Sequence, residues 1–375
     1  MKKTKFLAML LALVMLLSLT ACGLGSAPAA TTPEQSSTET EATAAPETSE
    51  SEDPYANVES KIIRFASNDT TANWNESGYS NTEADKFLVE EIYKRTEGRY
   101  KIEVYPDGQL ASSTSEQVAG LRNGDFEIAT VANGSFGSMS TAFAELNVPF
   151  FLPSLDAARQ LIDSDIGAAM IERAEADTGL HVMYVKDQSF RQVTTSGKEV
   201  VAPADFKGLK IRTQSDPIQM AAFEALGCAV TSIPFSELYT ALQQKVIDAE
   251  ENPWATIYSK QFYEVQKYAV QTNHIFTCVI MLMSPDFWNS LTPEDQQIFN
   301  EVFREAQLYN REIVDKGETF YKDACRDAGV TVYEPTEEEL AAIKAVMVDA
   351  VYDDCRDAMG QERWDALNAF IESVA

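Results

Sequence analysis

The sequence of 375 residues is poor in histidine and in basic side chains. Its two histidines, His181 and His274, lie far apart in the chain, and such a pair does not predict a zinc or iron centre. Lys and Arg together number 30 against 58 Asp and Glu, which gives a formal net charge of −28. Because nucleic acids and anionic lipids are bound through basic surfaces, this balance argues against both as partners. An anionic ligand would need a local, sheltered positive site.

The chain also lacks the short motifs that mark common catalytic centres. The patterns G-x-x-x-x-G-K-[ST], G-x-S-x-G and H-E-x-x-H and the EF-hand loop are all absent. The many carboxylates are spread along predicted helices, where they form solvated faces. The sequence therefore predicts a binding protein without catalytic residues, metal or cofactor, and a surface enzyme acting on organic acids is an alternative that no motif supports.

Cysteine is scarce and forms no metal-binding pattern. Five cysteines are present, and the four beyond Cys22 contain no C-x-x-C pair. Cys325 and Cys355 fall in neighbouring predicted helices, so one disulfide between them is possible. Four free structural thiols, with Cys228 and Cys278 as the other two, fit the spacing equally well.

The N-terminus has the features of a processing signal. Lys2, Lys3 and Lys5 precede an apolar run over 6–19, which is too short for a transmembrane helix. The segment 19–22, Leu-Thr-Ala-Cys, resembles a bacterial lipobox, which implies cleavage after residue 21 and lipid on the thiol of Cys22. An ordinary signal peptide with a chance cysteine is the alternative.

The residues after this signal cannot form a core. Residues 22–57 are dominated by Ala, Thr, Ser, Pro and Glu, which predicts a disordered tether. No later apolar run is long enough to cross a bilayer. The sequence therefore predicts a folded body held by its lipid at the outer, extracytoplasmic face of the cytoplasmic membrane.

The body alternates between strand and helix patterns. Strands are predicted over 61–66, 100–105 and 127–132, with helices over 83–96 and from a capping box at Ser113 to Gly124. This order, strand-helix-strand-helix-strand, is typical of a parallel, doubly wound sheet.

A second α/β unit follows farther along the chain. Its predicted elements are strands over 208–212, 230–233 and 246–249 and helices over 217–226 and 236–245. A helix capped by Thr292 extends to about residue 328 and would be roughly 50 Å long at 1.5 Å per residue, longer than one domain. The fold class expected is α/β with two domains, crossed by this helix. The boundaries expected are 58–188 with 278–317 for domain I and 189–277 with 318–375 for domain II.

Several segments, in the right order, resemble one family of binding proteins. They include FRQVTTS at 190–196, PADFKGLKIR at 203–212, PFSELYTALQQ at 234–244, residues 248–253, and FASN at 65–68, YPDGQL at 105–110 and VPFF at 148–151. The chain resembles the DctP family, the substrate-binding proteins of TRAP transporters, over 61 to about 360.

The resemblance implies both a fold and a function. Members of the family have a two-domain, type II-like periplasmic-binding-protein fold and are not enzymes. They hold a small carboxylate, such as a C4-dicarboxylate, sugar acid or keto acid, between the domains and deliver it to small and large membrane subunits. A monomer is expected. A binding component of an ABC importer or a ligand-sensing lipoprotein is the alternative, and the genes next door would separate these possibilities.

The resemblance also implies site residues. Arg212 matches the arginine that pairs with the ligand carboxylate, and it ends a predicted strand, where α/β proteins bind ligands. Arg191, Asn252, Phe235 and Asn68 match further family positions, and Asn133 and Trp74 are candidates because they lie in loops after predicted strands of the first domain. The matching residues also have structural alternatives, which are strand-surface charge for Arg191, capping for Asn252, core packing for Phe235 and turn formation for Asn68.

One segment departs from the family pattern. Where the family usually has Asp-Gly-Gln-Glu-Asn, this chain has Asp-Ala-Glu-Glu-Asn at 248–252. If Glu250 faces the ligand, its charge would weaken binding of a simple dicarboxylate and favour hydroxyl-rich or cationic groups. If it faces solvent, it has little effect.

Overall fold

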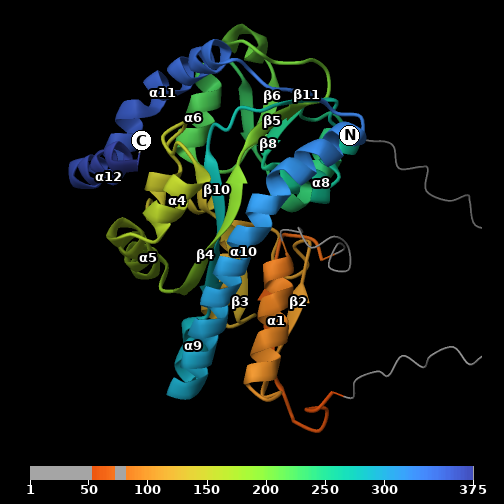
Figure 1. Cartoon of the computed structure of the whole chain (residues 1–375), viewed down its shortest axis with the longest axis vertical. Helices are drawn as coiled ribbons and strands as arrows, with labels where there is room; N and C mark the ends of the chain where they lie inside the picture. Colours follow the sequence, from red (N-terminus) through yellow and green to blue (C-terminus); the bar gives the residue numbers. More distant parts are fainter. Residues whose placement is uncertain (1–52, 72–81, 375) are drawn as a thin grey trace, which may run out of the picture. The chain divides into compact units, whose positions relative to one another are not determined.

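The computed structural model describes residues 53–71 and 82–374 (Figure 1). The predicted signal peptide, Cys22, most of the predicted tether and Trp74 lie outside the described residues. The last part of the predicted tether is packed, because the Tyr55 and Tyr93 rings are 5.9 Å apart and Tyr93 donates a hydrogen bond to Asp53. Among the described residues, no helix combines the length and the apolar character needed to span a bilayer.

In the described part of the chain, the strands form two sheets. The five-stranded sheet has the order β2 (Tyr100–Tyr105), β1 (Lys61–Ala66), β3 (Ile128–Ala132), β10 (Phe276–Met283) and β4 (His181–Phe190). The six-stranded sheet has the order β11 (Thr331–Tyr333), β9 (Tyr268–Val270), β5 (Gln192–Thr195), β8 (Ala249–Asn252), β6 (Lys210–Thr213) and β7 (Ala229–Ser232). The α/β class predicted from the sequence is confirmed.

Helices cover both sheets. The α-helices are α1 (Glu83–Arg95), α2 (Thr114–Asn123), α3 (Asn133–Phe136), α4 (Leu155–Ile162), α5 (Asp165–Thr178), α6 (Pro217–Ala225), α7 (Leu238–Gln243), α8 (Trp254–Ser259), α9 (Pro285–Ser290), α10 (Pro293–Asp327), α11 (Glu337–Met359) and α12 (Gln361–Val374). Short 3₁₀ turns are η1 (Ala144–Leu146), η2 (Pro203–Phe206), η3 (Phe235–Glu237) and η4 (Phe262–Glu264).

The side-chain caps predicted for two helix starts are present in the structure. Ser113 accepts a hydrogen bond from the Glu116 amide in a capping box at α2, and Thr292 caps α10. These caps satisfy amides that would otherwise lack a partner at a helix start. Gly124 ends α2 with φ of 74°, a conformation that glycine adopts without steric cost.

The sheets differ from the parallel pattern expected for them. β1 is parallel to β2 and β3, but β10 is antiparallel to both β3 and β4. The reason is that β10 returns from the second sheet directly, without a crossover helix, and its eight residues are all buried. The prediction for β8 was also wrong in its bounds. The pattern predicted a strand over 246–249, whereas the strand covers Ala249–Asn252.

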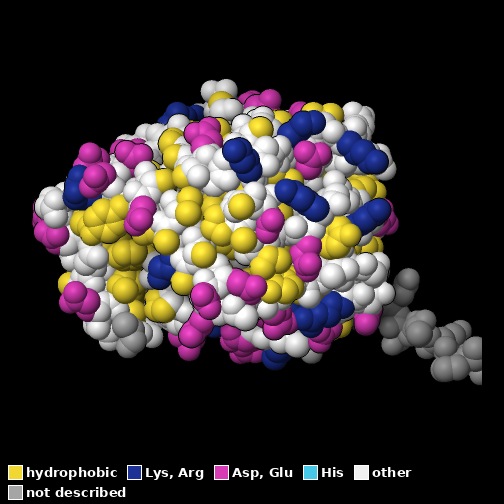
Figure 2. All heavy atoms as spheres, turned by 90° about the horizontal axis from the view of Figure 1, so that it is seen from above, with side chains coloured by type: hydrophobic (Ala, Val, Ile, Leu, Met, Phe, Trp, Pro, Cys, Tyr) yellow, Lys and Arg dark blue, Asp and Glu magenta, His cyan; other side chains and the backbone are white. Residues whose placement is uncertain are grey.

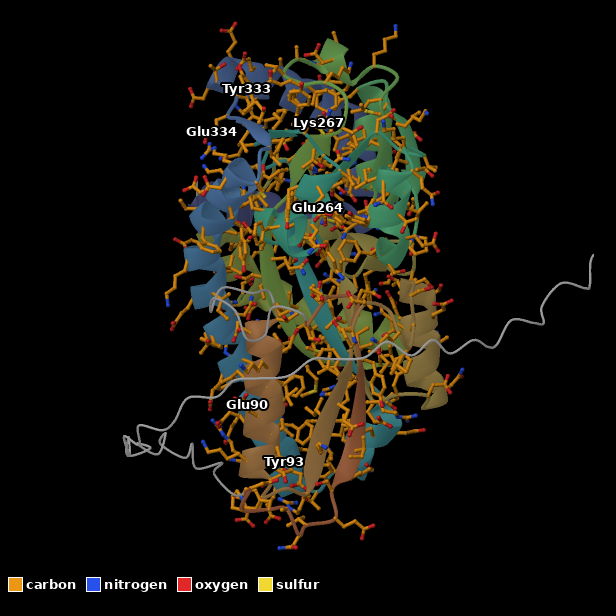
Figure 3. All side chains as sticks on the ribbon, turned by 90° about the vertical axis from the view of Figure 1, so that its right-hand side faces the viewer. Glu90, Tyr93, Glu264, Lys267, Tyr333 and Glu334 are labelled. Carbon is orange, nitrogen blue, oxygen red and sulfur yellow. The ribbon has the colours of Figure 1, made fainter. Side chains whose placement is uncertain are left out.

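The long helix α10 contacts elements of both sheets, as its length predicted. It packs on α1 and β4 beside the first sheet and on α8 and β11 beside the second (Figure 1). Glu90 and Tyr93 mark α1, and Tyr333 and Glu334 mark the end of β11 (Figure 3). Two ion pairs to Glu334, from Lys322 and Arg326, fasten the end of α10 beside β11.

The four cysteines among the described residues are buried free thiols. Cys325 packs in the apolar cluster around Trp254, and Cys355 packs in the cluster that contains Trp364. The structure therefore selects free thiols over the possible Cys325–Cys355 disulfide. Burial raises the pKa of both thiols to about 12, so they are unreactive at neutral pH.

Candidate ligand-binding site

A cavity of about 60 Å³ lies where loops and strand ends of the two sheets meet. Its lining is mostly polar and consists of Asn68, Asp69, Thr114, Gln117, Thr130, Ala132, Ser135, Gln188, Arg212, Gln214, Phe235, Asn252, Thr256 and Val279. A second, larger chamber of about 210 Å³ adjoins it and shares Asn68, Thr114, Ser135, Arg212 and Phe235. We call these the anchor chamber and the serine chamber, since the second is also lined by Ser112, Ser113, Ser115, Ser138, Ser215 and Ser232.

Four of the predicted site residues line these chambers. Arg212, Phe235 and Asn68 line both, and Asn252 lines the anchor chamber. Arg212 lies on β6, Phe235 on η3 and Asn252 on β8, whereas Asn68 lies in the loop after β1. The fold therefore brings together residues from both sheets.

Arg212 is a buried cation that pairs with no carboxylate of the described residues. Its residue is 3% exposed, and its Nε and Nη2 donate to the Ile233 carbonyl oxygen at 3.2 and 3.1 Å. The Phe235 ring centroid lies 5.9 Å from its Cζ. The ion pairs found among the described residues do not include Arg212. Burial, helped by the charge of Arg191, lowers the pKa of Arg212 to about 10, so the side chain is still charged at neutral pH.

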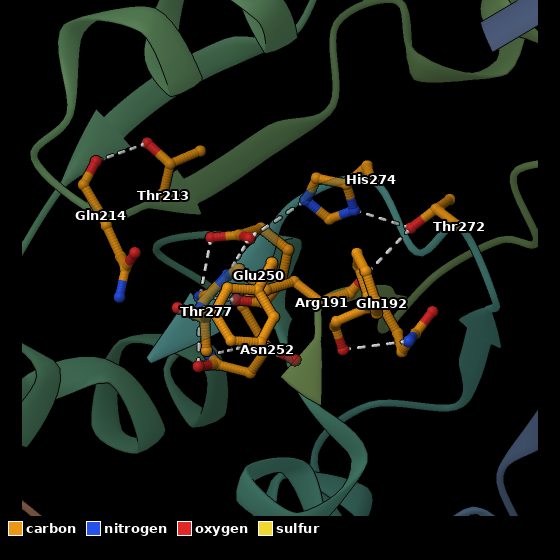
Figure 4. A network of polar contacts seen from close by, with 12 residues as sticks. Arg191, Gln192, Thr213, Gln214, Glu250, Asn252, Thr272, His274 and Thr277 are labelled. Atoms are coloured by element: carbon orange, nitrogen blue, oxygen red, sulfur yellow. Dashed lines mark hydrogen bonds and ion pairs between the residues drawn. The ribbon is translucent and has the colours of Figure 1, made fainter. Parts of the chain in front are cut away.

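Arg191 is buried as deeply but is fully engaged (Figure 4). It forms an ion pair with Glu251, with Nη2 2.9 Å from Oε1, and it donates to Thr277 at 3.3 Å. His274 contacts the same Glu251 carboxylate at 3.1 Å. Burial raises the pKa of Glu251, but Arg191 and His274 outweigh it and hold that pKa below its usual value. Arg191 lines neither chamber, so direct contact with a ligand stays a prediction.

The Asn252 side chain connects this ion pair to the anchor chamber. Its Oδ1 accepts from Arg191 at 3.1 Å, and its Nδ2 donates to Glu250 at 2.6 Å. Arginine can only donate, so the Asn252 oxygen faces Arg191 and its Nδ2 faces Glu250, which fixes the direction of the amide. The ion pair thus holds Asn252 in one orientation at the chamber wall.

Glu250 faces neither solvent nor the chambers. It is fully buried behind Asn252 and also accepts a hydrogen bond from Thr194. Burial raises the pKa of Glu250 to about 7. Glu250 therefore faces neither the ligand chamber nor solvent, the two alternatives that the sequence left open. It lies instead in the layer of residues beneath the chamber wall.

Asn133 has a structural environment. Its amide donates to Asn147 at 2.8 Å and to the Phe276 carbonyl at 3.2 Å, and its Oδ1 accepts from Thr277 and Cys278 at 3.0 Å. These bonds join the end of β3 to β10. Asn133 lines neither chamber, so its ligand contact also stays a prediction, as does that of Trp74, which lies outside the described residues.

The sequence reasoning missed several lining residues. Gln117 lies in the first turns of α2, and Gln214 comes two residues after Arg212. Gln214 could have been predicted from its spacing, because residues two apart along an extended segment share a face and Arg212 was already a candidate. Gln117 could have been predicted from the capping box, since that motif places the start of α2 just after the loop that follows β2.

Lys260, at the end of α8, connects the two sheets beside the chambers. Its Nζ donates to the Asn68 carbonyl and to the Asp107 carboxylate, both at 2.7 Å, and lies 5.3 Å from the Phe235 ring centroid. Asn68 and Asp107 follow β1 and β2. This contact therefore ties the second sheet's side of the site to the first.

The overall charge of the protein does not favour anions. In the face that Figure 2 shows, several basic side chains lie on one part of the surface and acidic side chains gather along the opposite edge. With a net charge of −28, long-range attraction of an anion is not expected, so any anion affinity must come from a local positive site.

Comparison with known proteins now identifies the family. A family model described as bacterial extracellular solute-binding protein, family 7, matches residues 71–357. The chain belongs to this family. It is 30% identical to the 2,3-diketo-L-gulonate-binding periplasmic protein YiaO of Escherichia coli K12, over 74% of this chain and 86% of that protein.

Two further relatives agree with this assignment. The C4-dicarboxylate-binding periplasmic protein DctP of Rhodobacter capsulatus is 28% identical over 74% of this chain and 82% of its own. A TRAP periplasmic solute-binding protein from Bordetella bronchispeptica superposes with a TM-score of 0.74 at 28% identity, covering 82% of this chain and 98% of that one. The DctP-family resemblance of the sequence is confirmed.

Proposed function

We propose that this solute-binding protein captures a small organic acid in the two chambers and delivers it to the membrane subunits of a TRAP-type transporter. The observation that carries the proposal is Arg212, a charged guanidinium that is 3% exposed and has no carboxylate partner among the described residues. A buried charge is costly unless it is paired. A ligand carboxylate supplies the missing charge and can accept two parallel hydrogen bonds from a guanidinium.

The mechanism proposed is closure of two domains around the ligand. The boundaries are those expected from the sequence, 58–188 with 278–317 and 189–277 with 318–375. Because Arg212 and Asn68 come from different sheets, a bound acid contacts both sides at once and shifts the population toward the closed form. Exclusion of water then strengthens the pairing with Arg212.

The location and the partners are also proposals. Lipid on Cys22 would hold the protein at the outer face of the cytoplasmic membrane, and the small and large TRAP subunits would receive the acid. Relatives named as periplasmic binding proteins support an extracytoplasmic site. A sensor, or a partner of an ABC importer, would bind the same acid, so adjacent genes for two TRAP membrane subunits are the observation that separates these alternatives.

Thermal unfolding of the full-length chain with carboxylic acids and their neutral amides tests the proposal. An acid at 100 times its dissociation constant should add about 2.7 kcal/mol to the free energy of unfolding. We expect stabilisation by an acid, none by its amide and none by the acid in Arg212→Ala. Equal stabilisation by acid and amide would contradict carboxylate recognition, and so would a shift that Arg212→Ala retains.

A further inference from the structure

Gln117 carries a buried amide that nothing in the described part of the chain satisfies. Its residue is 0% exposed, and neither its Nε2 nor its Oε1 has a hydrogen-bond partner there. The side chain lines the anchor chamber. Asn68, which lines the same chamber, also has a buried Oδ1 without a hydrogen-bond partner among the described residues. Because an unsatisfied buried amide costs free energy, these atoms are available for a ligand.

The chemistry of these atoms restricts what can satisfy them. The Gln117 amide offers two donors and one acceptor oxygen, and Asn68 adds a second acceptor oxygen. A hydroxyl group both donates and accepts, so it can serve either side. An ionised carboxylate only accepts, and a methylene does neither. The acceptor oxygens therefore favour a ligand that carries hydroxyl groups.

The charges around the chambers restrict the ligand further. Among the described residues that line the two chambers, Arg212 is the one cationic side chain, and Asp69 adds a negative charge to the anchor chamber. Lys260, close by, already pairs with Asp107. A second ligand carboxylate would therefore be buried without a counter-ion, at a large cost in free energy.

The volumes of the two chambers also favour a hydroxylated ligand. The anchor chamber, at about 60 Å³, is much smaller than the serine chamber, at about 210 Å³. With a carboxylate held at Arg212, which both chambers share, the rest of a larger ligand extends into the serine chamber. Serine hydroxyls hydrogen-bond to a hydroxylated chain but do not neutralise an anion.

We infer that the ligand is a monocarboxylic acid whose remaining carbons carry hydroxyl groups, rather than a dicarboxylate. Arg212 binds the carboxylate, Gln117 and Asn68 bind hydroxyl groups, and the serine chamber holds the remainder of the chain. The inference rests on the proposed function and narrows its substrate class.

Four acids of equal chain length separate carboxylate number from hydroxylation. Hexanoate and adipate carry one and two carboxylates without hydroxyl groups, and gluconate and glucarate carry one and two with hydroxyl groups. Calorimetric titration of the full-length protein should give the tightest binding for gluconate. We expect hexanoate and adipate to bind at least about tenfold more weakly, the effect of one unsatisfied buried polar group.

The outcomes distinguish the inference from the proposed function. Adipate equal to or tighter than gluconate, or glucarate tighter than gluconate, would overturn the inference while leaving carboxylate binding intact. Binding of none of the four acids would overturn the inference alone, because other small acids would still satisfy the proposed function. Binding of gluconate that Arg212→Ala retains would overturn the proposed function and the inference with it.

A matched pair of variants tests Gln117 itself. Gln219, on α6, is also buried and neither of its amide atoms has a hydrogen-bond partner in the described part of the chain, but it lines neither chamber. Gln117→Leu should reduce the ratio of gluconate to hexanoate affinity by about tenfold, and Gln219→Leu should leave that ratio unchanged. An unchanged ratio in Gln117→Leu would contradict the role of Gln117. Should that variant fail to fold, the four acids on the unmodified chain still decide the inference.

Discussion

Two arginines of the second sheet's region are equally buried and have opposite surroundings. Arg191 is 1% exposed and pairs with Glu251, Asn252 and Thr277, whereas Arg212 is 3% exposed and donates only to the Ile233 carbonyl among the described residues. Burial alone therefore does not identify a ligand-binding arginine. The counter-charge separates the two, since Arg191 has one from Glu251 and, in the proposed function, Arg212 receives one from a ligand.

The two residues are also coupled. Arg191 orients Asn252 at the chamber wall, and its charge contributes to the lowered pKa of Arg212. In the function proposed above, the paired arginine positions the chamber wall and the unpaired one binds the ligand carboxylate. Four sets of variants test this difference between the two arginines.

The largest effect is expected from Arg191→Ala. The change leaves the Glu251 carboxylate buried with only His274 beside it, and breaking a buried pair in this way costs about 3–5 kcal/mol of folding free energy. Denaturant unfolding measures it. The partly exposed pair of Arg64 and Glu127 is the control, and Arg64→Ala should cost less than Arg191→Ala, about 1 kcal/mol. Equal losses in the two variants would contradict a structural role for Arg191.

Arg212→Ala should show the reverse pattern. Acid affinity should fall by about 2–5 kcal/mol, as when one partner of a buried charge pair is removed. Stability of the ligand-free protein should not fall, because no carboxylate of the described chain loses a partner. Calorimetry and unfolding of the same preparation measure both quantities. A strongly destabilised ligand-free variant would make Arg212 a structural residue.

Glu250→Gln should change how stability depends on pH. The pKa of Glu250 is raised to about 7 in the folded protein, so between its ordinary value of 4.5 and about 7 the folded state holds more protons than the unfolded state. Stability is therefore lost as pH rises through this window. Glu250→Gln should remove about 2–3 kcal/mol of the loss between pH 5 and pH 8.

Comparison of the two pH profiles isolates this residue. Burial also raises the pKa of Asp216 and of Glu318 to about 6, and these groups act in the same direction in both proteins. Their contribution cancels when the profile of Glu250→Gln is subtracted from that of the unmodified chain. A zero difference between the profiles would show that Glu250 is not the buried, proton-binding group described here.

The smallest effect is expected from Lys260→Met. The Lys260–Asp107 pair joins the two sides of the site but is half exposed at Asp107, so its loss should weaken acid binding by at most about 1 kcal/mol. Asp107→Asn should have less effect, because the bond from Lys260 to the Asn68 carbonyl remains. Calorimetric affinities measure both. A larger loss in Asp107→Asn than in Lys260→Met would contradict the contact as described.

Much of the fold could be predicted because its signals are local. The caps at Ser113 and Thr292 and the alternation over 100–105 act within a few residues, and β2, α2 and α10 match the predictions closely. The antiparallel placement of β10 could not be read in this way, since an all-apolar strand shows that it is buried but not which neighbours it pairs with.

The site could be predicted only in part. Arg212, Asn252, Phe235 and Asn68 were found because the family motifs contain them, and all four line the anchor chamber. The motifs did not separate Arg191 and Asn133, whose side chains are engaged within the protein, from the lining residues. The place of Glu250 follows from the register of β8, in which Thr194 pairs with Glu250. The strand predicted over 246–249 ended before residue 250, so the sequence did not indicate this pairing.

The most direct test of the account is a crystal structure of the full-length protein with its tightest-binding acid. The account predicts a ligand carboxylate oxygen within about 2.7–3.2 Å of the Arg212 guanidinium, with the Arg191–Glu251 pair unchanged. A carboxylate bound to Arg191, with Glu251 displaced and Arg212 making no contact with the ligand, would contradict it.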